Sequence, residues 1–566
     1  MFKKLTVLVL IGVLFSACNS TVPVSEDYTE SGNVEAAPRS APFSKGVNFS
    51  AWFESHSAES IPFTRYTEQD FIDAKSLGAD VIRLPVRMHS MTGGAPGYIL
   101  EPLFLRFLDT AVDWAEKHQL YIIIDNHSFD PIQATSDNID QILIPVWEQI
   151  ARRYRNRSSL VIYEILNEPH GISDARWGEI QGKTIEAIRR IDRNRLIIVG
   201  GTDYNSIGKL NAIPNYNDSN LIYTFHFYDP YLFTHQGETW GGAPTLSTLE
   251  NLPFPYNFRR MPRIPNNLRG TWVEGSLNYS YPKDANPAAL RATLDKVVAF
   301  SKERNVPVFC GEFGVYMIQS PKEDRIIWYE IVAAALDRRN ISRTSWDYYG
   351  GFGLFNGERG SFNHDLNTGV ARALGFTPPP QIPRTEQPLN SGFYIYNDFP
   401  NAQFVNTGHW GQNVVFSLYD TSRPSGEYSI RWSNASQYDV FYFEFDLSKR
   451  DFRTLVNNNY YLEFKARAAS PVDFAVRFVN IESSSSIPWR MQYNIDSATL
   501  TPDGNWHTIR IPLNQMSDIG AWLNATQQWV VSRGEFTWQH VFRLEFVAEQ
   551  RALPETIWFD DIRLGN

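Results

Sequence analysis

The chain has 566 residues, of which 43% are hydrophobic and 20% charged, a composition that suits several folded domains and excludes a largely disordered protein. Its net charge of −10, with no extended basic block, argues against nucleic acid or an anionic membrane surface as a partner. Two cysteines exclude a disulfide framework and a cysteine-based zinc site.

The first 18 residues have the pattern of an export signal. Lys3 and Lys4 precede a short apolar run, which ends in Ser-Ala and Cys18 and is too short to span a membrane. Small residues before a lone cysteine resemble a bacterial lipobox. We therefore expect an exported cell-envelope lipoprotein anchored at Cys18, with ordinary cleavage and secretion as the alternative. Residues 19–42 lack apolar periodicity and predict a flexible tether.

From residue 43 to 376, strand-like runs alternate with helical patterns. Eight runs rich in β-branched and apolar residues predict strands: Lys45–Asn48, Asp80–Pro85, Tyr121–Asp125, Leu160–Asn167, Arg195–Gly200, Leu221–Phe227, Val306–Glu312 and Ile341–Asp347. Eight such units in about 330 residues favour a (β/α)8 barrel, in which the active site forms at the C-terminal ends of the strands.

The helices between these strands carry recognisable signals. Thr67 and Asp70 form a capping-box pattern, and Gly78 marks the end of that helix. Apolar residues recur at helical spacing from Ile139 to Tyr154, around Pro145, which predicts a distortion. A doubly wound open sheet is the alternative fold, but no Gly-x-Gly-x-x-Gly or Walker motif follows an early strand.

Three segments after the sixth predicted strand differ from the barrel pattern. The connection 229–284 is unusually long and rich in aromatic residues, so we expect it to form a wall of a cleft. Residues 377–391 begin with a proline-rich run and predict a stiff linker. Residues 392–566 show short alternating runs without helical periodicity, which predicts an all-β jelly-roll sandwich domain.

Two glutamates far apart in the chain indicate the chemistry. Glu168 ends the fourth predicted strand in an Asn-Glu-Pro motif, and Glu312 ends the seventh in Gly-Glu-Phe-Gly. Carboxylates at two strand ends can meet at one bond. Retaining hydrolysis of glycosides needs such a pair, one carboxyl as acid and then base and the other as nucleophile, roughly 5 Å apart.

Other polar or aromatic side chains also end or follow predicted strands: Arg83, His127, Asn167, His226, Tyr228 and Trp346. With the two glutamates, this set resembles glycoside hydrolase family 5, the cellulase family of glycoside hydrolase clan A, over residues 43–376. The resemblance implies a (β/α)8 hydrolase that requires no cofactor and no metal in the barrel.

The resemblance also implies a role for each residue. Glu168 corresponds to the acid/base and Glu312 to the nucleophile. Asn167 corresponds to the residue that binds the 2-hydroxyl of the sugar at the cleavage point. Trp346 corresponds to the ring beneath the sugar before the scissile bond. The remaining four correspond to residues that support the carboxylates and this sugar: Arg83, His127, His226 and Tyr228. The partner of the Tyr228 hydroxyl is left open.

Simpler interpretations apply to some of these side chains. Glu164 lies four residues before Glu168 and is interpreted as a buried structural carboxylate, while Cys310 is interpreted as inert core. His127 and His226 are candidate metal ligands of an amidohydrolase-type barrel, but the His-x-His motif expected near the first strand is absent.

The pattern of residues 392–566 resembles jelly-roll carbohydrate-binding modules. Four tryptophans in or beside predicted turns are candidate ligand-binding residues: Trp489, Trp522, Trp529 and Trp538. Asp560 and Asp561 are candidate ligands of a structural calcium ion, with a strand-end cap as the alternative.

These observations predict a retaining endo-β-glycanase whose leading substrate is a β-1,4-glucan of the cellulose type. The family also includes enzymes for mannan, mixed-linkage glucan and xyloglucan, and these substrates stay open. A non-catalytic lipoprotein that binds polysaccharide at the cell surface is the alternative from another class, although the paired carboxylates argue against it.

Overall fold

The structure is a computed structural model that describes residues 28, 30–128, 133–385, 387–402, 405–480 and 487–566. The predicted leader, with Cys18, lies outside the described residues. Within the described part, no helix has the length and apolar character needed to cross a bilayer. The predicted tether was too long, because Ala37 and Ala41 are buried and the Ala37 N–H donates to the carbonyl of Arg339.

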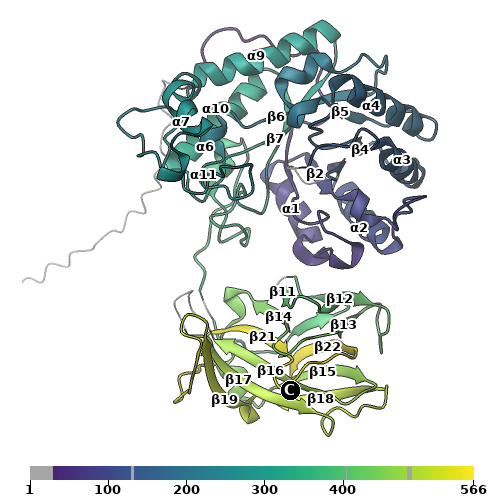
Figure 1. Ribbon diagram of the computed structural model, residues 1–566, viewed down its shortest axis with the longest axis vertical. Helices are drawn as coiled ribbons and strands as arrows, with labels where there is room; N and C mark the ends of the chain where they lie inside the picture. The colour runs from purple at the N-terminus through teal and green to yellow at the C-terminus, as the bar shows by residue number, and fades with distance from the viewer. Residues whose placement is uncertain (1–27, 29, 129–132, 386, 403–404, 481–486) are drawn as a thin grey trace, which may run out of the picture. The chain divides into compact units, whose positions relative to one another are not determined.

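Eight parallel strands close into a barrel, which confirms the predicted fold (Figure 1). Their bounds are β1 Lys45–Asn48, β2 Val81–Val86, β3 Tyr121–Asn126, β4 Val161–Glu164, β5 Ile197–Gly200, β6 Leu221–Phe227, β7 Val308–Phe313 and β8 Ser342–Ser345. Strand β1 pairs with both β2 and β8, and this closes the ring. Apolar side chains from successive strands, including Val81, Ile123 and Ile162, pack together in one buried cluster.

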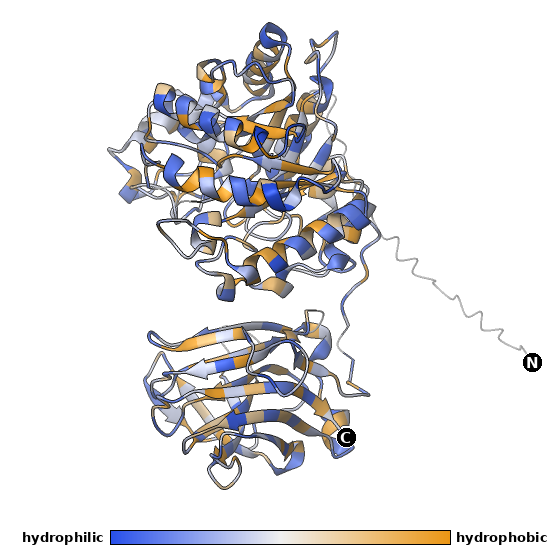
Figure 2. Ribbon diagram, turned by 90° about the vertical axis from the view of Figure 1, so that its right-hand side faces the viewer, coloured by the Kyte–Doolittle hydropathy of each residue, from blue (hydrophilic) through white to orange (hydrophobic). Residues whose placement is uncertain are grey.

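Helices surround the strands, with apolar strand residues inside and polar helix faces outside (Figure 2). The longer ones are α1 Glu68–Leu77, α2 Pro102–Lys117, α3 Asp140–Tyr154, α4 Asp174–Arg189, α9 Pro287–Arg304 and α10 Lys322–Arg338. Helix α1 has the predicted capping box of Thr67 and Asp70, and it ends at Gly78 in a left-handed conformation. Pro145 lies inside α3, and the distortion expected there stays a prediction.

The long connection between β6 and β7 is folded rather than irregular. It contains α6 Tyr231–Thr234, a 3-10 turn at Asn266–Leu268, α7 Trp272–Tyr279 and α8 Tyr281–Asp284. The Tyr281 hydroxyl donates to the carbonyl of Pro253, and Arg260 forms an ion pair with Asp324 of α10. The first contact lies within the connection, and the second attaches it to the barrel.

The C-terminal part forms two antiparallel sheets of seven strands each, which confirms the predicted sandwich. One contains β9 Tyr394–Asn397, β10 Phe399–Pro400, β12 Val415–Asp420, β13 Ser429–Ser433, β15 Tyr461–Ala468, β18 Trp506–Pro512 and β22 Ile557–Gly565. The other contains β11 Val405–Trp410, β14 Val440–Phe445, β16 Asp473–Asn480, β17 Trp489–Asp496, β19 Ser517–Leu523, β20 Gln528–Val530 and β21 Val541–Val547. Aromatic rings such as Phe441, Phe546 and Phe559 fill the core.

The expectation that four tryptophans lie in or beside turns agrees with the structure. Trp538 lies in a turn and packs against Phe452 and Phe478, so it is half-buried. Trp522 of β19 and Trp529 of β20 lie on either side of the turn that joins these strands, and Trp489 is the first residue of β17.

Gly46 of β1 provides a test of barrel packing. A Cβ at this position would lie 1.7 Å from the carbonyl oxygen of Val81 in β2, so a side chain cannot fit unless the strand moves. We expect Gly46→Ala to lower the free energy of unfolding of the barrel by roughly 3 kcal/mol or more. Gly93→Ala is the control, because a Cβ there meets no atom within 4 Å. Denaturant unfolding of both variants checks this, and equal stabilities would contradict it.

Candidate active site

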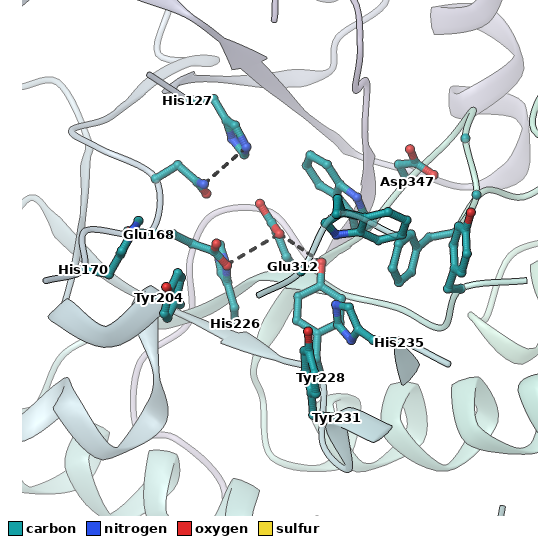
Figure 3. Close-up of a pocket in the computed structure, with 18 of the residues that line it drawn as sticks. His127, Glu168, His170, Tyr204, His226, Tyr228, Tyr231, His235, Glu312 and Asp347 are labelled. Atoms are coloured by element: carbon teal, nitrogen blue, oxygen red, sulfur yellow. Dashed lines mark hydrogen bonds and ion pairs between the residues drawn. The ribbon is translucent and has the colours of Figure 1, made fainter. Parts of the chain in front are cut away.

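The strand ends converge on one open cleft of about 1450 Å³ (Figure 3). Seven of the eight predicted site residues line it: His127, Asn167, Glu168, His226, Tyr228, Glu312 and Trp346. Arg83, the eighth, is fully buried and bonded to two of the seven. The fold therefore brings together all of the residues that the strand-end pattern singled out.

Arg83 of β2 is surrounded by carboxylates. Its Nε and Nη2 donate to the two oxygens of Glu164 at 2.8 and 2.9 Å, and its Nη1 donates to Oε1 of Glu312 at 2.8 Å. Oδ2 of Asp125 lies 3.0 Å from Nη2, which also donates to Oδ1 of Asn167. Glu164 is buried as predicted, and its two bonds hold the guanidinium in one orientation.

Glu312 of β7 is held as an anion although it is buried. Burial raises the pKa of its carboxyl, but this effect is outweighed by the charges of His226, Arg83 and His127 and by the hydroxyl of Tyr228. The result is a pKa of about 2. The Tyr228 hydroxyl donates to Oε2 of Glu312 at 2.9 Å, which settles the partner that the sequence left open. An ionised, oriented carboxylate is what a nucleophile requires.

Glu168 reaches the cleft because β4 ends early. Regular alternation would place Asn167 and Glu168 on opposite faces, but β4 stops at Glu164 and Glu168 has a φ of 46°. A register shift in β6 places His226 opposite Glu312. Nδ1 of His226 lies 2.6 Å from Oε1 of Glu168 and 3.6 Å from Oε2 of Glu312. Burial lowers the pKa of His226, but the charge of Glu312 and the bond to Glu168 raise it overall.

His127 and Trp346 form another side of the site. Nδ1 of His127 lies 2.8 Å from Oδ2 of Asp125, and this pair raises the pKa of the imidazole to about 9 against the effect of burial. Nε2 of His127 lies 3.2 Å from Nδ2 of Asn167, a contact that instead favours the neutral ring. The shorter bond to Asp125 dominates. The rings of His127 and Trp346 stack with centroids 5.5 Å apart.

The cleft has further lining residues that the sequence analysis did not single out: Glu54, His170, Tyr204, Tyr231, His235 and Asp347. They lie in the loops after β1, β4, β5, β6 and β8. Oε1 of Glu54 lies 3.8 Å from Nε2 of His127, and burial raises the pKa of Asp347 to about 7. A search that continued several residues beyond each predicted strand end would have found them.

Some side chains of the cleft are arranged closely enough to be candidate metal ligands. Among the described residues, one group offers three ligand atoms within 4.8 Å of one another, and it consists of Glu168, His226 and Glu312. These side chains already bond to one another or to Tyr228. Their arrangement therefore suits proton transfer.

The candidate calcium site in the sandwich has a competing cation. Nζ of Lys465 lies 2.6 Å from Oδ2 of Asp561, so the carboxylate is already paired. Oδ1 of Asp560 accepts from the Asp561 N–H in the middle of β22, so the pair does not cap a strand end, and that alternative was wrong. Calcium at Asp560 and Asp561 stays a prediction.

Comparisons with known proteins agree with this geometry. Residues 43–351 match the model of the family described as cellulase (glycosyl hydrolase family 5), and residues 396–566 match the model of carbohydrate binding domain 30. Endoglucanase C of Acetivibrio thermocellus is 27% identical over 349 residues, which cover 58% of this chain and 98% of that protein. Endoglucanase 3 of Fibrobacter succinogenes is 28% identical over 58% of this chain and 52% of that protein.

A solved structure is also similar. The cellulose synthase subunit Z from Clostridioides difficile is 26% identical and superposes with a TM-score of 0.50, covering 59% of this chain and 99% of that one.

The hydroxyl of Tyr228 makes the pH dependence of the site testable. Tyr228→Phe removes a hydrogen bond to the anion of Glu312, so the pKa of Glu312 rises from about 2 and the acidic limb of kcat/KM moves to higher pH. A bond to a charged group is worth about 1.5–3 kcal/mol, which corresponds to a shift of roughly one to two pH units. The pH profile of both proteins on a soluble glycan measures this.

Tyr223→Phe is the matched control. Tyr223 lies on β6, the strand that ends just before Tyr228, but it packs against Phe300 of α9, so its variant should keep the wild-type profile. An unshifted acidic limb in Tyr228→Phe would contradict the assigned role of the hydroxyl.

Proposed function

The chain belongs to glycosyl hydrolase family 5, and we propose that its barrel is a retaining endo-β-glycanase that cleaves β-1,4-glucan by double displacement. In this proposal Glu312 is the nucleophile and Glu168 the acid/base. One observation carries it. A carboxylate oxygen of Glu168 and one of Glu312 lie within 4.8 Å of each other, which suits direct attack on the sugar and leaves no room for the intervening water of an inverting enzyme.

In the first step, Glu168 gives its proton to the glycosidic oxygen while Glu312 attacks the anomeric carbon. The bond between that carbon and the leaving oxygen breaks, the leaving sugar departs with the proton, and a glycosyl ester of Glu312 forms. Arg83 and Tyr228 orient the two oxygens of Glu312 before attack. Asn167 and Trp346, which line the cleft, contact the sugar on the nucleophile side.

In the second step, Glu168 acts as the base. Formation of the ester removes the negative charge of Glu312, so an anionic Glu168 no longer has a like charge beside it. Glu168 takes a proton from water, the water oxygen attacks the anomeric carbon, and Glu312 leaves as a carboxylate. Two inversions restore the original β configuration. Nδ1 of His226 lies 2.6 Å from Oε1 of Glu168, so it can hydrogen-bond to Glu168 both as the acid and as the carboxylate.

The choice of substrate rests on the relatives. Several are named endoglucanases, which favours an internal β-1,4-glucan bond as the target, and an open cleft admits a long chain. Mannan, mixed-linkage glucan and xyloglucan remain alternative substrates. A purely binding role for the barrel is disfavoured, because a binding protein has no need for the hydrogen bonds that keep Glu312 ionised.

We further propose that the sandwich binds polysaccharide on the outer face of the sheet that contains β14. Trp410 and Trp529 are 48% and 41% exposed, and strand pairing directs both toward this face. The guanidinium of Arg543 lies 4.4 Å from the centroid of Trp410, and that of Arg490 lies 5.4 Å from the centroid of Trp529. Rings with adjacent donors suit the apolar faces and hydroxyls of pyranoses.

Export and lipidation are proposals that rest on residues 1–18 alone. The basic, apolar and small-residue segments that end at Cys18 support an envelope-anchored enzyme, with secretion after ordinary cleavage as the alternative. An enzyme for polymeric glycans needs to meet its substrate outside the cytoplasm, and this agrees with export.

The proposed mechanism determines the stereochemistry of the product. An NMR time course of soluble β-glucan hydrolysis should show the β-anomer first, with the α-anomer appearing only through mutarotation. Glu312→Gln should release no product, because the amide cannot attack the anomeric carbon. An α-anomer in the first spectra, or wild-type turnover by Glu312→Gln, would refute the proposal. A panel of soluble glycans under the same conditions ranks the substrates.

The exposed rings of the sandwich should matter only on solid substrate. Trp410→Ala and Trp529→Ala should each weaken binding to insoluble cellulose severalfold and slow its hydrolysis, because the domain raises the local substrate concentration. Hydrolysis of soluble oligosaccharides should stay nearly unchanged. Tyr394→Ala, on β9 of the other sheet, is the control. Binding should be micromolar or weaker and insensitive to salt, and full retention by both tryptophan variants would contradict the proposed face.

A further inference from the structure

One buried amide beside the active site has no part in the steps described above. Asn48, the last residue of β1, is fully buried and does not line the cleft. Its side-chain oxygen accepts from Nη1 of Arg83 at 3.0 Å. Its side-chain nitrogen donates to the carbonyl oxygens of Gly311 and Ser345, each at 3.1 Å. Both hydrogens and the oxygen of the amide therefore have partners inside the barrel.

The partners of Asn48 fix which way its amide points. A carbonyl oxygen only accepts hydrogen bonds, and a guanidinium only donates them. The nitrogen must therefore face the two carbonyls, and the oxygen must face the guanidinium of Arg83. Strand pairing brings these two residues together, because Asn48 of β1 is in register with Arg83 of β2. The amide thus presents a fixed, uncharged acceptor to Arg83.

Nη1 of Arg83 has two hydrogens and serves two acceptors. It donates to Oε1 of Glu312 at 2.8 Å and to Oδ1 of Asn48 at 3.0 Å. The other nitrogens of the guanidinium donate to Glu164 and Asn167. Asn48 therefore takes the hydrogen of Nη1 that Glu312 does not use. Because the amide is neutral, it adds no negative charge to a guanidinium that already faces three carboxylates.

Without this acceptor, the contact between Arg83 and Glu312 would change. A buried N–H group that has no acceptor is unfavourable. The carboxylate of Glu312 already lies on Nη1, so it would turn to accept both hydrogens. Such a turn takes Oε2 away from the hydroxyl of Tyr228, which donates to it at 2.9 Å (Figure 3). A carboxylate displaced in this way attacks slowly, since attack requires close alignment of the reacting atoms.

We propose that Asn48 is a positioning residue for Glu312. Its side-chain oxygen takes the second hydrogen of Nη1, so Glu312 accepts a single hydrogen bond from Arg83 and keeps its other oxygen on Tyr228. Asn48 acts through Arg83 and does not touch the sugar, so it is not itself catalytic. This inference rests on the proposed function, because it takes Glu312 as the nucleophile.

The test isolates the attack by Glu312. With 2,4-dinitrophenyl 2-deoxy-2-fluoro-β-cellobioside, Glu312 forms an ester with the anomeric carbon, and dinitrophenolate leaves with the electrons of its bond without a proton from Glu168. The fluorine slows hydrolysis of this ester, so the mass of the intact protein reports its formation. Asn48→Ala should lower the limiting rate of ester formation roughly tenfold or more. The half-saturating concentration should stay within about twofold, because the contacts with the sugar are unchanged.

A second variant separates the acceptor from the space that it fills. Leucine has nearly the shape of asparagine but no acceptor, so Asn48→Leu fills the site and excludes water. Asn48→Ala leaves room for a water molecule, which can accept from Arg83 and donate to the carbonyls of Gly311 and Ser345. We therefore expect ester formation to be slower in Asn48→Leu than in Asn48→Ala. A packing role predicts the reverse order, because leucine leaves no cavity.

Thr344→Val is the matched control. Thr344 of β8 is fully buried, and its hydroxyl donates to the same carbonyl oxygen of Gly311 at 2.6 Å, but its bond does not involve Arg83. Its variant should form the ester within about twofold of the wild-type rate, even where its melting temperature falls. Combined with Tyr228→Phe, Asn48→Ala should lose less than the product of the two single losses, whereas Thr344→Val should multiply with it.

The outcomes separate this inference from the function on which it rests. If the wild type forms no ester at Glu312, the proposed function fails and the inference fails with it. If the wild type forms the ester and Asn48→Ala does so equally fast, or Asn48→Leu restores the rate, the function stands and the role of Asn48 is wrong. Should Asn48→Leu not fold, Asn48→Ala and Thr344→Val decide, because equal losses in these two would assign the effect to the carbonyl of Gly311 and overturn the inference.

Discussion

A single guanidinium organises the floor of the active site. Arg83 is fully buried and contacts three carboxylates, those of Asp125, Glu164 and Glu312. A buried cation of this kind is stable only when its donors are matched with acceptors, and a buried carboxylate needs the same cation. Because Glu164 uses two of the donors, Nη1 remains oriented toward Glu312. Glu312, the proposed nucleophile, is therefore oriented before any substrate arrives.

Above this floor, one imidazole contacts both of the proposed catalytic carboxylates. His226 lies 2.6 Å from Glu168 and 3.6 Å from Glu312. Arg83 and Tyr228 act on Glu312 alone. The two glutamates therefore differ in their surroundings, because Glu312 accepts hydrogen bonds from Arg83 and Tyr228 and Glu168 does not. Glu312 has more donors, whereas Glu168 is closer to solvent, which agrees with the acid/base role proposed for it.

The sequence predicts the barrel well because several of its strands, such as β3, β5 and β6, lie in apolar runs. It predicts Arg83 and Glu312 because each is a charged residue within or at the end of such a run. It does not predict Tyr204 or Glu54, which reach the cleft through loop conformations that depend on contacts with distant segments. In the sandwich, the sequence does not delimit strands such as β11 and β19, because they are partly exposed and carry few consecutive apolar residues.

Closure of the barrel determines when the site can exist during synthesis. Asn48 of β1 donates to the carbonyl oxygens of Gly311 and Ser345, and the latter lies 297 residues further along the chain. The ribosome must therefore synthesise nearly the whole barrel before β1 can pair with β8. Until then Arg83 has no nucleophile to orient. Catalytic competence arises late and all at once, so a chain shortened before β8 would be inert as well as incomplete.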